Sequence, residues 1–480
     1  MALARKIAYN VAISSASKIL STVLALVSIA FITRYLGKEG FGNYATVLAF
    51  LSFFAALADL GLYPISTREI SKEGAPEAKI MGNIFSLRII SALAILAIAP
   101  IVVLLFPYPA EVKSGIIIVA LSFSFSSGYQ VLNGIFQKNL AMDKVAIAEL
   151  AGKILQVGFI IFAVKERLGF NWIIASLLFN MVLSFAIVFL WSRKYLRFHM
   201  EFDFKYWRHF LKESLPLGLA AIITFAYFKM DTVILSLLRS SADVGIYNAA
   251  YKVLENITFF PAMIVGLMFP LFSKHIFTER EVFLAMANKT FKVFVVIALP
   301  LVIGALFLSE GIIQVIGGGG FSEAAAVLRI LVFAIALIFF GNFFNSILIA
   351  ANLQKKLLCI MGAAAVINIG LNLIFIPRFS YFGAAYVSVI TEFIVAALGF
   401  YVSAKTVNYF PKAEKFLMIL MSGAVMALFL FIFQQKNFFF LLMASPIIYF
   451  FFLWLFRAVK TEEIASLISK KGIQEYEAIP

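Results

Sequence analysis

The chain is a succession of long apolar runs separated by short polar turns, from about residue 8 to residue 457. Segments such as 80–106, 170–191 and 438–456 have no polar face that could be turned toward water. An apolar run of about 20 residues has the length that a helix needs to cross a bilayer core. Because backbone groups in lipid must bond to one another within the segment, these runs are predicted to be helices. The pattern therefore predicts an all-α, polytopic membrane protein.

Fourteen spans follow from this pattern, with ends placed to within about four residues. They are 10–33, 41–62, 80–106, 114–138, 145–165, 171–192, 214–237, 246–272, 290–309, 324–350, 357–376, 381–403, 414–434 and 438–457. An even number of spans puts both termini on the same side of the membrane.

Composition agrees with this class, since 63% of the residues are hydrophobic and only 14% are charged. The charges also predict an orientation. Of the 40 Lys and Arg residues, 26 lie in or beside the N-terminus, the even-numbered loops and the C-terminal tail, and 8 lie in or beside the odd-numbered loops. Basic residues in short loops stay cytoplasmic, so we expect a multi-pass protein of the cytoplasmic membrane with both termini cytoplasmic. The net charge of +15 is spread along these loops, which argues against a nucleic-acid partner.

The sixth loop is the richest in basic residues, and its simplest interpretation is anchoring to anionic headgroups. It holds Arg193, Lys194, Arg197, Lys205, Arg208 and Lys212. Cys359 is the single cysteine, so no internal disulfide is possible. His199, His209 and His275 lack metal-ligand spacing, and neither a metal nor another cofactor is expected.

Weak internal echoes join spans that lie six apart. Residues 41–44 (FGNY) begin the second span and 244–247 (VGIY) begin the eighth, while 133–136 (NGIF) in the fourth echo 345–348 (NSIL) in the tenth. An offset of six spans keeps both partners pointing the same way, as in the parallel repeats of transporters. The expected domains are an N-terminal six-helix lobe at 1–193, a basic cytoplasmic linker at 194–213, a C-terminal six-helix lobe at 214–405, an extra helix pair at 406–457 and a cytoplasmic tail at 458–480.

Three stretches carry a resemblance to a known family. They are RYLGKEGFGNY at 34–44 with ADLGL at 58–62, VGIYNAAYK at 244–252 with FPLFS at 269–273, and 345–356 followed by NIGLNLIFIP at 368–377 and GAA at 383–385. These stretches resemble the polysaccharide-biosynthesis flippases, which include O-antigen exporters. That family belongs to the superfamily of multidrug, oligosaccharidyl-lipid and polysaccharide exporters, together with the lipid II flippase.

The resemblance implies a fourteen-helix, two-lobe flippase that works by alternating access. Its substrate would be a lipid-linked oligosaccharide, a glycan on a polyprenyl diphosphate, moved across the membrane for cell-surface polysaccharide biosynthesis. By the same analogy, the last two spans would hold the polyprenyl tail. Such a protein would be a transporter and not an enzyme, and we expect a monomer.

Ionisable residues within the spans are the candidate site, because an anionic head crossing hydrocarbon needs a cationic, water-accessible cavity. The candidate substrate-binding cations are Lys18, Arg88, Lys229 and Lys252. Candidates for binding a coupling H⁺ or Na⁺ are Asp231, Asp59 and Glu392.

Spacing separates local ion pairs from residues that need a distant partner. Glu149 with Lys153, and Lys252 with Glu255, lie four and three residues apart and can pair on one helix face. Lys229 and Asp231 are two apart and do not face each other. Lys18 and Arg88 have no acidic neighbour on their own helix. Each of those two could line a cavity or extend to the headgroups.

Two other functions are open. A cation-coupled multidrug exporter of the same superfamily would usually have twelve spans and a more acidic cavity. A polytopic glycan polymerase or glycosyltransferase would typically need a long external loop or domain, whereas the longest external connection predicted here is about a dozen residues.

Overall fold

The computed structural model describes residues 2–412 and 415–459, and every regular element within them is helical. The α-helices are α1 Ala2–Asp59, α2 Leu62–Ile70, α3 Glu77–Val102, α4 Ala110–Lys138, α5 Met142–Lys165, α6 Phe170–Ser192, α7 Phe204–Leu238, α8 Ser241–Ile257, α9 Phe259–His275, α10 Arg280–Gly317, α11 Glu323–Ala350, α12 Gln354–Val407, α13 Phe416–Ile432 and α14 Phe438–Leu455. Short 3₁₀ turns follow α3 at Val103–Leu105 and α10 at Gly319–Phe321. Nearly all of the predicted cytoplasmic tail lies outside the described residues.

Two helices are interrupted where the sequence pattern places turns. In α1, Gly37 has φ 66°, which glycine adopts at little steric cost, and it separates the first predicted span from the second. In α12, Ser380 has φ 50° and falls between the eleventh and twelfth predicted spans. The eighth predicted span is also divided, since α8 ends at Ile257 and α9 begins at Phe259.

The fold class is confirmed as all-α and polytopic. Eleven helical stretches in the described part of the chain are long and apolar enough to cross a membrane, and α13, with 17 residues, is apolar but shorter. Two of those stretches contain the interruptions at Gly37 and Ser380. The number of fourteen crossings stays a prediction.

The chain forms two compact units. Unit 1 runs to Asn248 and includes the tip Ile316–Gly320, and unit 2 comprises Ala249–Val315 and the chain from Phe321 onward. The predicted domain boundaries at 193, 213, 405 and 457 stay predictions.

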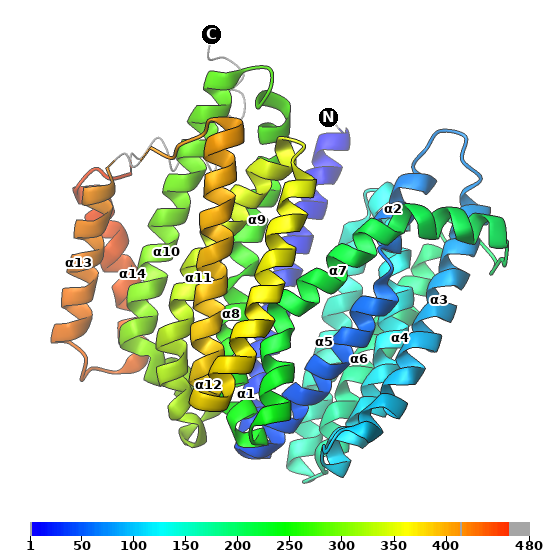
Figure 1. The fold of residues 1–480 in the computed structure, drawn as a ribbon, viewed down its shortest axis with the longest axis horizontal. Coiled ribbons are helices and arrows are strands. Elements are labelled where there is room, and N and C mark those ends of the chain that lie inside the picture. The colour runs from blue at the N-terminus through cyan, green and yellow to red at the C-terminus, as the bar shows by residue number, and fades with distance from the viewer. Residues whose placement is uncertain (1, 413–414, 460–480) are drawn as a thin grey trace. The chain divides into compact units, whose positions relative to one another are not determined.

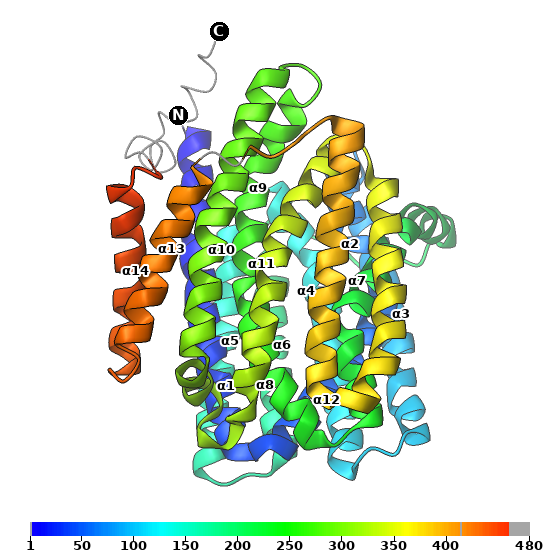
Figure 2. The ribbon, with the colours of Figure 1, turned by 60° about the vertical axis from the view of Figure 1, so that its left-hand side comes forward.

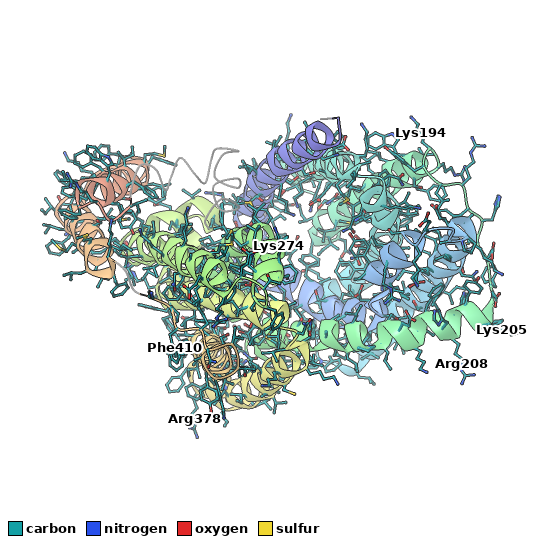
Figure 3. The ribbon with its side chains drawn as sticks, turned by 90° about the horizontal axis from the view of Figure 1, so that it is seen from above. Lys194, Lys205, Arg208, Lys274, Arg378 and Phe410 are labelled. Atoms are coloured by element: carbon teal, nitrogen blue, oxygen red, sulfur yellow. The ribbon has the colours of Figure 1, made fainter. Side chains whose placement is uncertain are left out.

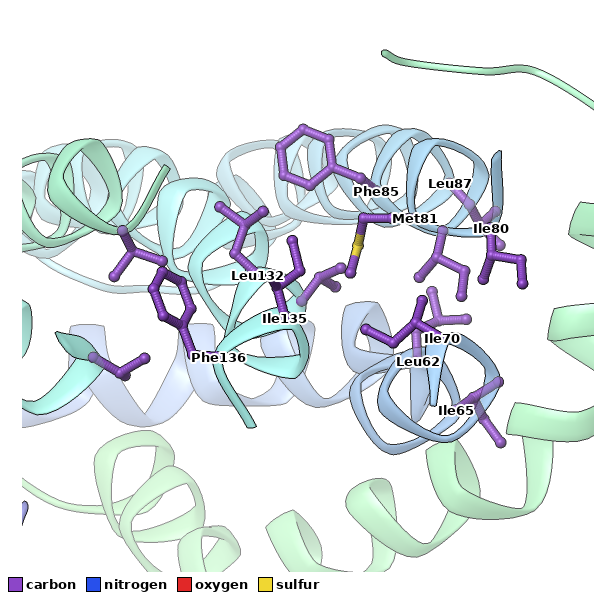
Figure 4. Close-up of a cluster of buried hydrophobic side chains, with 14 of the residues drawn as sticks. Leu62, Ile65, Ile70, Ile80, Met81, Phe85, Leu87, Leu132, Ile135 and Phe136 are labelled. Carbon is purple, nitrogen blue, oxygen red and sulfur yellow. The ribbon is translucent and has the colours of Figure 1, made fainter. Parts of the chain in front are cut away.

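Unit 1 contains helices α1 to α7 and the start of α8 (Figure 1). One buried hydrophobic cluster joins α2, α3 and α4, and Figure 4 shows side chains of these helices pointing toward one another. Its labelled members are Leu62, Ile65, Ile70, Ile80, Met81, Phe85, Leu87, Leu132, Ile135 and Phe136. Phe210, on α7, is buried against the same cluster, so the beginning of α7 is part of this core.

The segment before α7 is bound to α3. The backbone N–H of Asp203 donates to Asn83 Oδ1 at 2.8 Å, and Asn83 Nδ2 donates to the Glu201 carboxylate at 3.1 Å. The Ser86 hydroxyl donates to the carbonyl of Glu201. Gly82 admits this segment, because a Cβ there would lie 2.2 Å from the carbonyl oxygen of His199. The second half of the predicted linker, from Phe204, is the first part of α7.

Unit 2 contains the rest of α8 and helices α9 to α14. The pair α13 and α14 packs on α10, as Figure 2 shows. The buried contact includes Val296 and Leu308 of α10, Met426 of α13 and Tyr449 of α14. The Tyr449 hydroxyl donates to the carbonyl of Val296 at 3.0 Å, which satisfies its one polar atom.

Candidate functional site

Arg88 of α3 binds the end of α1. Its Nη2 lies 2.8 Å from Asp59 Oδ1 and 3.2 Å from Gln130 Oε1, and its Nη1 donates to the carbonyl of Ala58. The last carbonyls of a helix lack intrahelical donors, and a cation there also interacts favourably with the helix dipole. The Arg88 side chain is 3% exposed and Asp59 is 32% exposed. Arg88 therefore does not extend to the headgroups, and Asp59 is its counter-ion.

Lys18 of α1 has an acidic partner on another helix. Its Nζ lies 3.5 Å from Glu149 Oε1 of α5, and the two side chains are 45% and 46% exposed. The pairing of Glu149 with Lys153 on one helix face, which their spacing allows, stays a prediction. Lys153 Nζ donates to Gln156 Oε1 at 2.9 Å.

A row of uncharged polar residues joins α5 to α6. The predicted site did not include it, because only ionisable residues were candidates. Asn180 Nδ2 donates to Gln156 Oε1 at 3.1 Å, and Ser184 Oγ donates to Asn180 Oδ1 at 3.3 Å. Gly152 allows this approach, since a Cβ would lie 2.1 Å from Ser184 Oγ. The signal was visible in the sequence. Ser176, Asn180 and Ser184 recur every four residues in an otherwise apolar span, as interhelical contacts in membranes often do.

Asp231 lies buried in α7 and accepts hydrogen bonds from α7 and α8. The backbone N–H of Thr232 donates to its Oδ1 at 2.6 Å, and the Tyr247 hydroxyl of α8 donates to its Oδ2. Lys229, two residues earlier on the same helix, is half-buried. Asp231 is thus a carboxylate held inside unit 1 by hydrogen bonds from two helices.

Two candidates lie in unit 2. Lys252 Nζ is 2.5 Å from Glu255 Oε2, so the ion pair predicted from their spacing is confirmed. Glu392 of α12 is buried beside a hydrogen-bonded set in the same helix: Asn368 Nδ2 donates to Thr391 Oγ1 at 3.2 Å, and Asn372 Nδ2 donates to Asn368 Oδ1 at 2.9 Å. No group of three or more His, Cys, Asp or Glu side chains that could hold a metal is found among the described residues.

The glycines of the first sequence echo meet within unit 1. A Cβ on Gly42 would lie 1.7 Å from the carbonyl oxygen of Ser241, and one on Gly245 would lie 2.1 Å from that of Lys38. The second half of α1 and the start of α8 therefore cross with their backbones in contact. Close approach through small residues is the usual way in which membrane helices associate.

Unit 2 also holds an apolar cavity of about 720 Å³, which we call the aromatic groove. Helices α10, α11 and α12, the connection after α12 and helix α13 line it, and Figure 3 labels Phe410 of that connection. The lining residues are Phe291, Val295, Ala298, Leu299, Val302, Phe333, Ala336, Phe340, Phe344, Phe400, Phe410, Pro411, Phe416 and Leu420. All of these are apolar, so the groove suits a hydrocarbon ligand.

Apolar helices together with ionisable residues in their interior define a multi-pass membrane protein of the transporter type. The family model described as polysaccharide biosynthesis protein matches residues 7–276, and the chain belongs to that family. It is 25% identical over 295 residues to the "Capsular polysaccharide biosynthesis protein CapF" of Staphylococcus aureus, covering 60% of this chain and 73% of the relative. It is 23% identical over 369 residues to the "Probable low-salt glycan biosynthesis flippase Agl15" of Haloferax volcanii, covering 75% and 76%.

Solved structures share the fold. The lipid II flippase MurJ in an inward closed conformation superposes with a TM-score of 0.72 at 17% identity, covering 93% of this chain and 98% of that one. An inward-facing multidrug resistance MATE family transporter gives 0.65 at 16% identity, covering 82% and 98%. Flippases and drug exporters thus share this fold, and the fold does not choose between them.

Proposed function

We propose that this protein is a flippase that moves a lipid-linked oligosaccharide, a glycan on a polyprenyl diphosphate, across the cytoplasmic membrane for cell-surface polysaccharide biosynthesis. The observation that carries the proposal is the set of ionisable residues inside unit 1 of a chain from the polysaccharide biosynthesis family. Ionisable residues inside a membrane bundle mark substrate and ion pathways. The protein is a transporter and not an enzyme, with both termini cytoplasmic.

In this proposal the cations attract the diphosphate, and alternating access carries it across. Lys18 is the most accessible of them, because nearly half of its side chain is exposed. Lys229 and Lys252 are the further contacts. Arg88 reaches a phosphate only when Asp59 releases it, since the guanidinium is buried behind that carboxylate.

The coupling ion, H⁺ or Na⁺, would bind a carboxylate. Asp231 and Glu392 are buried and can change their hydrogen bonding when an ion binds. Asp59 is less suited to this role, because Arg88 already neutralises it at 2.8 Å.

The Lys18→Gln substitution is expected to slow flipping by tenfold or more, because a hydrogen bond to a charged group contributes about 1.5–3 kcal/mol and about 1.4 kcal/mol is tenfold in rate. The measurement uses sealed proteoliposomes and a fluorescent polyprenyl-diphosphate oligosaccharide that becomes accessible across the bilayer. Lys229→Gln is tested in parallel. Lys165→Gln, an exposed lysine at the end of α5, is the control and should leave the rate unchanged.

The outcomes separate the alternatives. Flipping that persists in Lys18→Gln and Lys229→Gln leaves the function intact and removes these residues from the site. A wild-type protein that flips no polyprenyl carrier but exports cationic dyes would be a multidrug exporter.

The aromatic groove offers a place for the polyprenyl tail, which is a branched hydrocarbon. Val302→Trp fills the groove and is expected to weaken crosslinking of a polyprenyl diphosphate that carries a photoreactive group in its tail. Val366→Trp, on an exposed part of α12 away from the groove, is the matched control. Equal crosslinking of both variants would place the tail elsewhere.

A further inference from the structure

The first three turns of α7 present two adjacent stripes of exposed side chains. At 100° per residue, positions 204, 211 and 215 fall on one stripe and positions 205, 208 and 212 on the next. The first stripe is Phe204, Leu211 and Leu215, all exposed, and Phe204 is 75% exposed. The second is Lys205, Arg208 and Lys212, also exposed. An apolar stripe thus runs beside a basic one.

The opposite side of this segment is fixed to the protein. Phe210 is 1% exposed and belongs to the buried hydrophobic cluster of unit 1, and Ser214 is fully buried. Asp203 caps the helix by accepting from the backbone N–H of Lys205 at 3.0 Å, and Lys79 of α3 lies 3.5 Å from its carboxylate. Packing of the opposite side of the helix against unit 1 therefore fixes the direction in which both stripes face.

The segment lies across the bundle rather than along it. In Figure 1 the first turns of α7 run nearly crosswise to α3, at the end of unit 1 where α2 lies. Figure 3, viewed onto that end, shows Lys205 and Arg208 at the outer edge of unit 1. A helix in this position lies along the membrane surface if α3 and α4 cross the bilayer.

The net charge of the exposed side chains in residues 204–215 indicates which kind of lipid they bind. Glu213 is the one acidic residue in 204–215. Its carboxylate pairs with Arg68 of α2, and His209 Nε2 lies 3.4 Å from its Oε1. No acidic side chain within this segment therefore offsets the basic stripe. A basic stripe beside an apolar one matches the headgroup and the upper acyl chain of an anionic phospholipid. An acidic soluble partner would leave Phe204 and Leu215 in water.

We propose that residues 204–215 form a binding surface for anionic phospholipids. Their phosphates contact Lys205, Arg208 and Lys212, and their acyl chains lie against Phe204, Leu211 and Leu215. This surface lies at the cytoplasmic leaflet if the proposed orientation holds. It is independent of the transported substrate.

The test places a fluorophore on the surface and measures which lipid surrounds it. Leu211→Cys in a Cys359→Ser background is labelled with bimane in the full-length protein. The protein is reconstituted with brominated phosphatidylglycerol in unlabelled phosphatidylcholine, or with brominated phosphatidylcholine in unlabelled phosphatidylglycerol, at equal mole fractions. Bromine quenches only nearby dye. We expect the local preference for phosphatidylglycerol to be about fivefold or more, from the attraction of even one basic residue near the surface.

Two controls decide the outcome. Replacing Lys205, Arg208 and Lys212 by Gln should abolish the preference, whereas the equal charge change in Lys113→Gln, Lys165→Gln and Arg167→Gln should keep it. The same dye at Leu105→Cys, an exposed site at the other end of α3, should show no preference. Equal quenching by both lipids at 211, no quenching at all, or a preference that survives the first triple substitution would each overturn the proposal.

Discussion

Asp59→Asn is expected to destabilise the protein by about 3 kcal/mol, because it leaves the Arg88 guanidinium buried without a counter-charge. Breaking a buried pair by removing one partner typically costs about 3–5 kcal/mol, and the lower end applies here because Asp59 is one-third exposed. The amide still accepts a hydrogen bond, so the variant tests charge and not shape. The measurement is thermal unfolding of the detergent-solubilised protein.

A second pair in the same protein is the matched control. Arg329 Nη2 lies 2.8 Å from Glu310 Oε1, the same distance as in the Arg88–Asp59 pair, but these side chains are 42% and 79% exposed. An ion pair this exposed contributes about 0–1 kcal/mol. Glu310→Gln should therefore barely change the unfolding temperature. Equal losses in Asp59→Asn and Glu310→Gln would contradict the role of burial.

The double variant Asp59→Asn with Arg88→Met separates stability from transport. Removing both charges is expected to recover most of the stability, since apolar replacements of buried pairs are often neutral. If the double variant also flips the fluorescent polyprenyl-diphosphate probe at the wild-type rate, the pair is structural and Arg88 leaves the candidate site. Recovered stability without flipping would assign the Arg88–Asp59 pair a part in transport.

Gly42→Ala is expected to abolish flipping and to cost about 3 kcal/mol, the upper end of the usual 1–3 kcal/mol for overpacking. The new Cβ would lie 1.7 Å from the carbonyl oxygen of Ser241, and a backbone atom cannot rotate away as a side chain can. The start of α8 must therefore move away from α1. Gly245→Ala should behave alike, because its Cβ meets the carbonyl oxygen of Lys38.

Gly158→Ala and Gly362→Ala are the controls, since a Cβ at either position meets nothing within 4 Å. In a helix, Ala is favoured over Gly by about 1 kcal/mol, so these variants should be as stable as the wild type or slightly more so. The unfolding temperature and the flipping rate are measured for all four substitutions. A Gly42→Ala variant that keeps both at wild-type values would show that the crossing can open at little cost.

The Gly42 and Gly245 contact joins two segments that the sequence echoes pair. These residues begin the second and eighth spans, which the sequence echoes predict to be equivalent positions of two repeats. A chain that moves its substrate by alternating access must change contacts between its moving parts. We expect this crossing to be one of the places where that change occurs.

The sequence by itself determined the class and the approximate positions of most helices. Most of α2 and the first ten residues of α7 and of α10 lie outside the predicted spans, because these parts are not apolar throughout. Apolar runs of about 20 residues leave a chain in lipid no alternative to helices, and Gly37 and Ser380 interrupt α1 and α12 between predicted spans. The Lys252–Glu255 pair was also predictable, because residues three apart on a helix are neighbours whatever surrounds them.

Only the tertiary structure decided the partners of the other charges. Glu149 of α5 pairs with Lys18 of α1, which lies 131 residues away in sequence. Arg88 finds Asp59 because α3 packs beside the end of α1. Sequence spacing determines which residues share a helix face. Which residue of another helix lies opposite that face depends on how the helices pack. Helix packing depends on the fit of many small contacts that no single motif records.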